Sequence, residues 1–509
     1  MARGVVAVIL RQWPGMVVAL IVLAVLLGSL AAVIGRADGF ALGPADWAAV
    51  RFTVAQALVS ALVSVVLAIP VARALARRRF VGRGALVTLL GAPFILPVIV
   101  AILGLLAVFG RGGMVNAGLA VLGFETVSIY GFSGVVLAHV FFNLPLATRF
   151  LLQGWLAIPA ERFRLAASLN APIGRLLEWP MLRAVLPGAF LVIFLICLTS
   201  FAVALTLGGG PRATTVELAI YQAMRFDFDL GRAALLAVVQ FTISAAAALL
   251  AWRVALPGGF GAGLDRTVAR WDGGPGWLDA AVITLAAAFL LLPLAMIVWR
   301  GVPGLVALPD AVWAAAGRSL IVALVSTGLV IVMALALALR GGRLIAIVGV
   351  LPLAASSLVV GTGLFVILYR WVSPAAIALP VTALLNAIMA LPFALRVLEP
   401  AVAQVQASFG ALADTLDMRG WARLRWVLLP RLRRPLGFAA GLAAALSMGD
   451  LGVIALFADA GQATLPLVMY RLMGAYRMES AAGTGLLLIG LSLGLFWVFD
   501  RGGRVDADA

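Results

Sequence analysis

Long apolar stretches recur along the whole 509-residue chain, and they constrain its fold more than any other feature. A helix needs roughly 20 mainly apolar residues to cross the hydrocarbon core of a bilayer, and backbone groups in lipid must be satisfied within the segment. The alternation typical of an outer-membrane barrel is absent from these stretches. We therefore predict an all-α, polytopic membrane protein with about twelve transmembrane helices. The stretches lie near residues 13–35, 50–72, 84–109, 131–152, 187–208, 231–252, 278–299, 313–339, 344–369, 378–399, 435–457 and 480–499.

The composition excludes a soluble protein. Hydrophobic residues make up 64% of the chain and charged residues 11%, against roughly 45–50% and about 25% in soluble proteins. A globule made from this chain could not cover its apolar residues with polar ones. Cys197 is the only cysteine and His139 the only histidine, which excludes disulfides and a His-rich metal site. We predict neither a catalytic site nor a metal site.

All the basic residues are arginines, and the formal net charge is +16. In a soluble protein this charge would suggest nucleic-acid binding, but here arginines gather in loops between the apolar stretches. Residues 73–83, 149–183 and 419–434 hold many of them, whereas the loops on the opposite side mix acids with fewer arginines. Short arginine-rich loops remain in the cytoplasm. We predict a multi-pass protein of the bacterial inner membrane, with both termini cytoplasmic and no nucleic-acid partner.

The two halves of the chain share short motifs in the same order. Leu144-Pro145 and Leu391-Pro392 each begin a Leu-Pro-x-Ala-x-Arg run, half a chain apart. Several ordered matches at one spacing indicate a duplication, and an even number of spans in each half gives both copies the same orientation. We predict a first repeat at 1–255, a cytoplasmic linker at 256–277 and a second repeat at 278–509.

The longest cytoplasmic segment of each half follows its fourth span, over 159–187 and 403–434. The second segment contains Ala411-Leu412-Ala413, then Asp417, then Leu429-Pro430. This spacing resembles the signature of the inner-membrane permeases of binding-protein-dependent ABC importers: Glu-Ala-Ala, three residues, Gly, nine residues, Ile-x-Leu-Pro. Ala411 stands in place of the Glu, and Asp417 in place of the Gly.

The first segment fits the same signature in two registers. One places Asn170 at the Gly position and is shorter than the second-half segment, and the other runs from Ser168 through Gly174 to Pro187. A short helix in each segment would lie against a partner protein, with small residues for close approach and leucines as an apolar stripe. The residues expected to couple the chain to an ATPase are Arg164, Leu165, Ala166, Ala167, Leu169, Asn170, Ala411, Leu412, Ala413, Leu416, Asp417 and Gly420.

The resemblance extends over nearly the whole chain. The runs 198–203, 207–215, 217–222 and 447–457 closely resemble the fused permeases of bacterial thiamine and thiamine-phosphate ABC importers, and fused ferric-iron permeases are the alternative. The resemblance implies a type I ABC importer permease fold, a periplasmic substrate-binding protein, a small cationic substrate and two copies of a cytosolic ABC ATPase. ATP would be used by that partner, with no cofactor in this chain.

The chain also lacks features of other function classes. A phosphate-binding loop requires a lysine after its glycines, and this sequence has no lysine. ATP hydrolysis is therefore expected in separate subunits, and the chain itself is not expected to be an enzyme. Charged residues inside membrane spans usually mark ion or proton pathways. The apolar stretches are nearly free of them, which argues against a secondary, ion-coupled carrier.

Asp450 is the main charged residue inside an apolar stretch. It lies about fifteen residues into the stretch 435–457, or about 22 Å along a helix, where it would either attract a cation or be capped locally near the outer interface. Phe201 holds a matching place in the first half and could stack on an aromatic cation. The outer loops 209–230 and 458–479 are expected to meet the delivering protein. The candidate residues of the substrate path are Asp450, Phe201, Ser200, Asn143 and Asn386.

Overall fold

The computed structural model describes residues 2–37, 41–91, 95–208, 210, 213–254, 267–268, 276–306, 308–342, 348–349, 351–352 and 354–504. Within these ranges the regular secondary structure is helical, as predicted for an all-α membrane protein. The predicted linker at 256–277 lies almost entirely outside the described residues.

The first half contains α1 to α11 and one π-helical turn, η2. These are α1 (Ala2–Arg36), α2 (Pro44–Arg77), α3 (Arg83–Leu89), α4 (Val98–Phe109), α5 (Met114–Val121), α6 (Phe132–Leu156), α7 (Ala160–Ser168), η2 (Gly174–Glu178), α8 (Trp179–Leu198), α9 (Phe201–Leu207), α10 (Val216–Arg225) and α11 (Leu230–Arg253).

The second half repeats this order of long and short helices. It contains α12 (Gly276–Gly304), α13 (Asp310–Arg340), α15 (Ser357–Leu368), α16 (Pro374–Thr415), α17 (Gly420–Arg423), η4 (Leu424–Leu428), α18 (Leu429–Met448), α19 (Gly452–Phe457), η5 (Ala460–Gln462), α20 (Leu465–Gly474) and α21 (Met478–Arg504).

Eleven helical stretches of the described chain are long and apolar enough to cross a membrane, against about twelve predicted. The difference arises at 344–369, where the described helix, α15, has 12 residues. At 1.5 Å per residue it spans about 18 Å, less than the roughly 30 Å of a hydrocarbon core.

Three other predicted spans are discontinuous, which corrects the sequence-based boundaries. The stretch 435–457 is divided between α18 and α19. The stretch 84–109 is divided between α3 and α4, and Pro97 precedes α4. The stretch 187–208 begins instead at Gly174, ends as a long helix at Leu198 and continues as the short α9. Hydropathy did not reveal these breaks because the residues on both sides of each break are apolar.

One hydrogen bond shows how closely the halves correspond. The hydroxyl of Thr53 on α2 accepts from the amide of Val216, the first residue of α10, at 2.9 Å. The hydroxyl of Ser319 on α13 accepts from the amide of Leu465, the first residue of α20, at 2.8 Å. Each satisfies an amide that a helix start leaves without an intrahelical partner.

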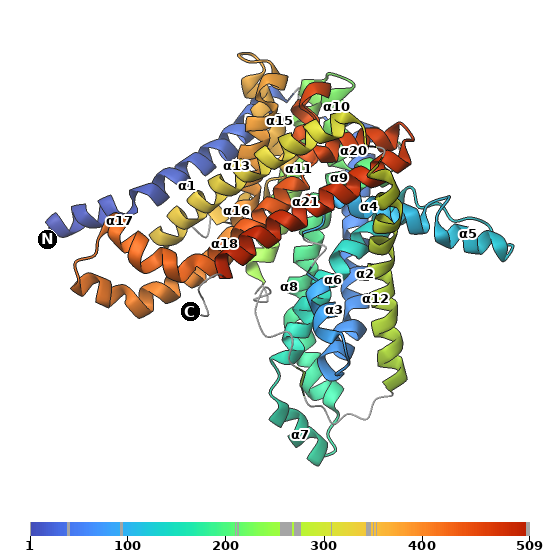
Figure 1. Ribbon diagram of the computed structural model, residues 1–509, viewed down its shortest axis with the longest axis horizontal. Coiled ribbons are helices and arrows are strands. Elements are labelled where there is room, and N and C mark those ends of the chain that lie inside the picture. The colour runs from blue at the N-terminus through green and yellow to red at the C-terminus, as the bar shows by residue number, and fades with distance from the viewer. Residues whose placement is uncertain are drawn as a thin grey trace.

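The helices form two limbs that meet at the top of Figure 1 and diverge below it. The limb at the lower right contains α2, α6, α8 and α12 and ends at α7, whereas the limb at the left contains α1, α13, α16 and α18 and ends near α17. Helices α10, α15 and α20 lie where the limbs meet, a region we call the apex. The two segments predicted to couple to an ATPase therefore lie at the far ends of separate limbs.

The two halves exchange their first helices. Helix α1 packs on α13 and α15 of the second half as well as on α11 of its own half, and α12 packs on α2 and α4 of the first half as well as on α21 of its own half (Figure 1). Asp279, near the start of α12, holds α2 through Arg77 at 2.5 Å and Arg78 at 2.6 Å. Neither limb is therefore made from one half alone.

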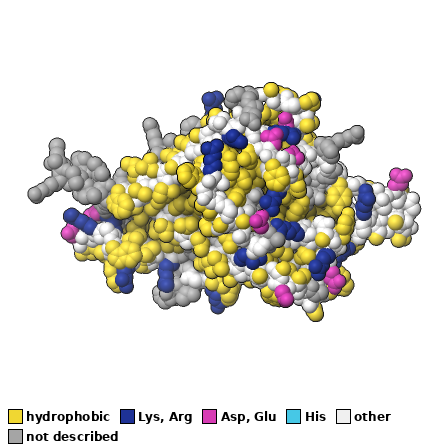
Figure 2. Space-filling view, turned by 90° about the horizontal axis from the view of Figure 1, so that it is seen from above, with side chains coloured by type: hydrophobic (Ala, Val, Ile, Leu, Met, Phe, Trp, Pro, Cys, Tyr) yellow, Lys and Arg dark blue, Asp and Glu magenta, His cyan; other side chains and the backbone are white. Residues whose placement is uncertain are grey.

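The surface is suited to lipid rather than to water. Figure 2 shows hydrophobic side chains over much of the face seen from above. Large apolar side chains such as Leu285, Trp299 and Ile321 are exposed on the long helices. An apolar surface of this extent is stable only in a bilayer or under partner proteins.

Candidate functional site

Each limb ends in a helical segment with one buried face and one exposed apolar face. Ala166 on α7 and Ala413 near the end of α16 are buried against the limb. Leu165, Leu169, Leu412 and Leu416, which lie at i and i+4 in each segment, are 57–69% exposed. Residues four apart share one side of a helix, so each limb end presents a pair of leucines, and no described residue covers most of their surface.

The two segments differ in how they join the preceding span. Helix α6 ends at Leu156, and α7 begins after Pro159, whereas α16 continues without a break to Thr415. Pro159 supplies no amide donor to continue the ladder of α6, while Gln406, which has one, stands at the equivalent second-half position. The second segment is therefore the last part of a 42-residue helix rather than the separate short helix that we predicted.

Both segments end in the same left-handed turn. Asn170 has φ 47° and Asp417 has φ 48°. In each segment the amide of the following residue donates to the carbonyl of the buried alanine at 2.8 Å, which is the 6→1 bond of a Schellman ending. Gly174, the glycine of the alternative register, starts η2 instead. The structure thus selects the register that aligns Asn170 with Asp417.

The π-helical turns also correspond. η2 and η4 each lead directly into a long helix with proline at its second position, Pro180 and Pro430. In the first half, Glu178 fixes η2 to α2 and α6, because it accepts from Arg73 at 2.9 Å and from the indole of Trp155 at 3.0 Å. The turn is therefore rigidly joined to the limb.

The remaining predicted coupling residues lie around these turns. Arg164, Ala167 and Ala411 are exposed, and Gly420 begins α17 with φ 52°. Asp417 pairs with Arg419 at 2.6 Å at the surface. The structure brings the first-half residues together at one limb end and the second-half residues together at the other.

The second functional feature is a helix break near the apex, repeated in both halves. Helix α8 stops at Leu198 before α9, and α18 stops at Met448 before α19. In the first half, Gln56 donates to the carbonyl of Cys197 at 3.0 Å, and Gln240 donates to that of Leu198 at 2.9 Å. These amides satisfy backbone oxygens that the break leaves free, which is obligatory inside a membrane.

The sequence-based reasoning missed both glutamines. The available signal was an uncharged amide within an otherwise apolar span, because such a side chain usually has a partner on a neighbouring helix.

Asp450 lies in the second-half break. It is partly exposed, its carboxylate faces the backbone amides of Gly452, Val453 and Ile454, and its Oδ2 has no hydrogen-bond partner among the described residues. One carboxylate oxygen therefore faces the start of α19, whereas the buried Oδ2 is left without a hydrogen-bond partner by the described residues.

Two close approaches place this break between helices of both halves. A Cβ added at Gly449 would lie 3.1 Å from the Cα of Pro97, which precedes α4. A Cβ added at Gly452 would lie 3.1 Å from the hydroxyl of Ser357, the first residue of α15. Asp450 therefore lies at the seam between the repeats, where a passage along the repeat axis would run.

The first-half break has a different character. Ser200 precedes α9 and is partly exposed, whereas Phe201 is 6% exposed and packs edge-on against Tyr221 of α10, with ring centroids 5.3 Å apart. In this conformation Phe201 is a packing residue and presents no free ring face to a substrate.

The two asparagines are also engaged within the protein. Asn143 donates to the carbonyl of His139 at 2.8 Å and approaches the Sγ of Cys197 at 3.4 Å. Asn386 donates to the hydroxyl of Ser447 at 3.0 Å. Both side chains are buried, so they tie α6 to α8 and α16 to α18. Asn386 lies beside the second-half break, because the carbonyl of Ser447 also accepts from the amide of Asp450 at 3.3 Å.

The predicted outer loops contain α10 and α20, and they join the halves at the apex. Arg225 donates to the carbonyl of Ala458 at 3.2 Å and lies 3.7 Å from Asp459. Arg212, which falls in the predicted loop 209–230, lies outside the described residues.

Glu217 lies in the loop 209–230 that was expected to meet a delivering protein, but it is fully buried. It faces Ser356 at the start of α15 and Gln240 on α11, although neither carboxylate oxygen has a well-formed hydrogen bond among the described residues. Burial raises the pKa of Glu217 to about 8, because it disfavours the charged form. Glu217 is thus a buried acid between the two halves and is not available to a delivering protein in this conformation.

Known proteins resemble this chain over most of its length, although no family model matches it. The thiamine transport system permease protein of Salmonella typhimurium is 40% identical over 482 residues, covering 89% of each chain. The protein of the same name from Escherichia coli is 39% identical, also covering 89% of each chain. The one from Haemophilus influenzae is 34% identical, covering 90% of this chain and 89% of the relative. This chain therefore belongs to the family of thiamine transport system permease proteins.

Proposed function

We propose that the chain is the membrane-spanning permease of an ATP-driven ABC importer that carries thiamine or its phosphates across the inner membrane. It supplies the passage, and it hydrolyses no ATP and holds no cofactor. Two copies of a cytosolic ABC ATPase bind the limb ends, and a periplasmic substrate-binding protein delivers the substrate at the apex.

The observation that carries this proposal is the 34–40% identity to thiamine permeases over about nine-tenths of the chain. The exposed leucine pairs supply a physical rationale for the coupling step. Two equivalent apolar stripes, one on each limb, suit two identical partner subunits.

The proposed orientation places the limb ends in the cytoplasm, together with both termini, and the apex at the periplasmic side. The arginines near the limb ends support it, since short arginine-rich segments remain cytoplasmic. The Arg225 contacts with Ala458 and Asp459 close the apex, whereas the limbs diverge towards α7 and α17 (Figure 1). We infer that the structure represents an inward-facing state.

Asp450 supports a cationic substrate, because its carboxylate lies at the seam with a buried Oδ2 that no described residue hydrogen-bonds. That charge would suit ferric iron as well as thiamine, so an uptake experiment must separate them. Cells that lack this chain should lose uptake of labelled thiamine and keep uptake of ferric iron. The reverse pattern would replace thiamine by iron, and uptake that persists after the ATPase is deleted would favour an ion-coupled carrier.

A further inference from the structure

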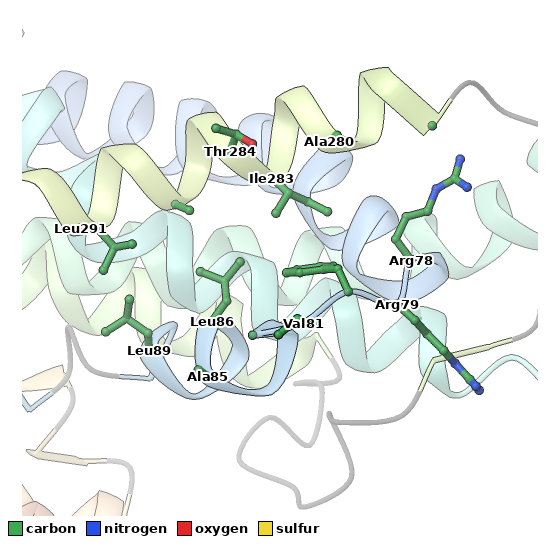
Figure 3. A pocket seen from close by; sticks show the side chains of 14 residues that line it. Arg78, Arg79, Val81, Ala85, Leu86, Leu89, Ala280, Ile283, Thr284 and Leu291 are labelled. Carbon is green, nitrogen blue, oxygen red and sulfur yellow. The ribbon is translucent and has the colours of Figure 1, made fainter.

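A groove of about 830 Å³ opens between α12, α3 and the end of α2 (Figure 3). The chemistry of its walls changes along its length. Arg78 and Arg79 lie at one end, whereas Leu86, Leu89 and Leu291 line the other (Figure 3). A groove with a basic end and an apolar body fits an amphipathic, anionic ligand.

The length of the groove matches one leaflet of a bilayer. Its α12 wall extends from Gly276 to Leu291, which is about 22 Å at helical rise. Half of a hydrocarbon core is about 15 Å thick, and the headgroup zone adds several ångströms. The lining residues Ala280, Ile283 and Ala287 recur at intervals of three and four along α12 and therefore form one continuous apolar stripe.

The basic end of the groove is formed by consecutive arginines at the end of α2. Asp279 binds both Arg77 and Arg78. Arg79 is exposed and donates to the hydroxyl of Thr267 at 2.6 Å. A hydroxyl carries no charge, so this contact does not neutralise the guanidinium. Arginine forks recognise phosphate oxygens.

We propose that this groove binds an anionic phospholipid of the cytoplasmic leaflet. Its phosphate lies at Arg78 and Arg79, and one acyl chain lies between α3 and α12. The leaflet assignment rests on the orientation given under the proposed function, while the lipid class rests on the groove itself. Asp279 joins α12 to α2 beside the phosphate position. The bound lipid, which contacts both sides of this junction, stabilises the packing of α12 on the first limb.

The test uses the purified full chain in nanodiscs with a photoactivatable phosphatidylglycerol, and crosslinked peptides are identified by mass spectrometry. We expect crosslinks in α3 and α12, and weaker ones with the phosphatidylcholine analogue. Arg79→Gln should lower phosphatidylglycerol labelling of these helices about five-fold, as expected for one basic residue at an anionic surface. Arg253→Gln, at the exposed end of α11, is the matched control and should not change it.

Two further arms complete the test. Ala287→Trp should fill the apolar body and reduce labelling by both lipids. Soluble glycerol phosphate should not compete, because it lacks the acyl chain. Equal labelling by the two lipids, unchanged labelling in Arg79→Gln, or competition by glycerol phosphate would overturn the proposal. The experiment contains neither ATPase nor thiamine, so its failure would leave the uptake result untouched.

Discussion

Asn170 and Asp417 adopt the same left-handed backbone conformation, with φ 47° and 48°, at the same turn of the two limb ends. The importer-permease signature has glycine at this position, since glycine enters this region without steric cost. Among residues with a side chain, Asn and Asp tolerate it best. The two departures from the signature therefore preserve the turn that the signature encodes.

Substitution of Asn170 tests this explanation. Asn170→Gly should keep the turn, whereas Asn170→Val should destabilise it by about 1–2 kcal/mol. Hydrogen exchange of the α7 amides measures the difference, and we expect roughly five- to thirty-fold faster exchange in the valine variant. Equal protection in the glycine and valine variants would show that the backbone conformation places no demand on this residue.

The leucine stripes give a second prediction. Leu169→Arg and Leu416→Arg should each reduce co-purification of the ATPase at least ten-fold, because a charge would enter an apolar contact, while the chain still inserts. Leu416→Met keeps the apolar surface and serves as the matched control. Ala413→Arg is a poorer probe, since Ala413 is buried against its own limb. Normal ATPase binding by both arginine variants would place the contact elsewhere.

Two substitutions of Asp450 separate the effect of its charge on transport from its effect as a cap of α19. Asp450→Asn keeps an oxygen for the amides at the start of α19 and removes the charge, so thiamine uptake should fall about ten-fold while assembly is unchanged. Asp450→Ala also removes the cap and should reduce assembly as well. If Asp450→Asn transports at the normal rate, the carboxylate is only a helix cap.

Glu217 makes stability depend on pH. Its pKa of about 8 in the folded chain exceeds the value near 4.3 expected for an unfolded chain. The folded state therefore retains a proton that the unfolded state has released, and stability falls as pH rises from about 4.3 to about 8. Glu217→Gln should flatten the decrease in thermal midpoint between pH 5 and pH 8. Glu125→Gln, at an exposed site, should leave it unchanged, and an identical slope in all three chains would contradict the burial argument.

The sequence predicted those features that depend on residue periodicity. The stripe of Leu412 and Leu416 and the small buried Ala413 follow from helical spacing, and the structure has both features; that these segments bind an ATPase stays a prediction. The break after Leu198 was not predicted, because hydropathy is continuous across it. The sequence feature related to that break is Gln56, an amide side chain within the apolar span α2 that donates to the carbonyl of Cys197.

Features that depend on which helices pack together could not be predicted from the sequence. Glu217 is in a polar region of the chain, yet α11 and α15 bury it. The exchange of α1 and α12 between the limbs leaves no periodic signal, because each helix is apolar on several faces and fits either half. Asn143 and Asn386 are polar residues in spans, but whether they contact a substrate or a neighbouring helix depends on tertiary packing.

The central claim is that this chain is a passage whose movement is driven by a separate ATPase. The most direct measurement is accumulation of labelled thiamine in proteoliposomes, with the substrate-binding protein on the side of the apex. The chain alone should produce no accumulation against a gradient, and addition of the ATPase with ATP on the side of the limb ends should produce it. Uphill accumulation by the chain alone would contradict the account.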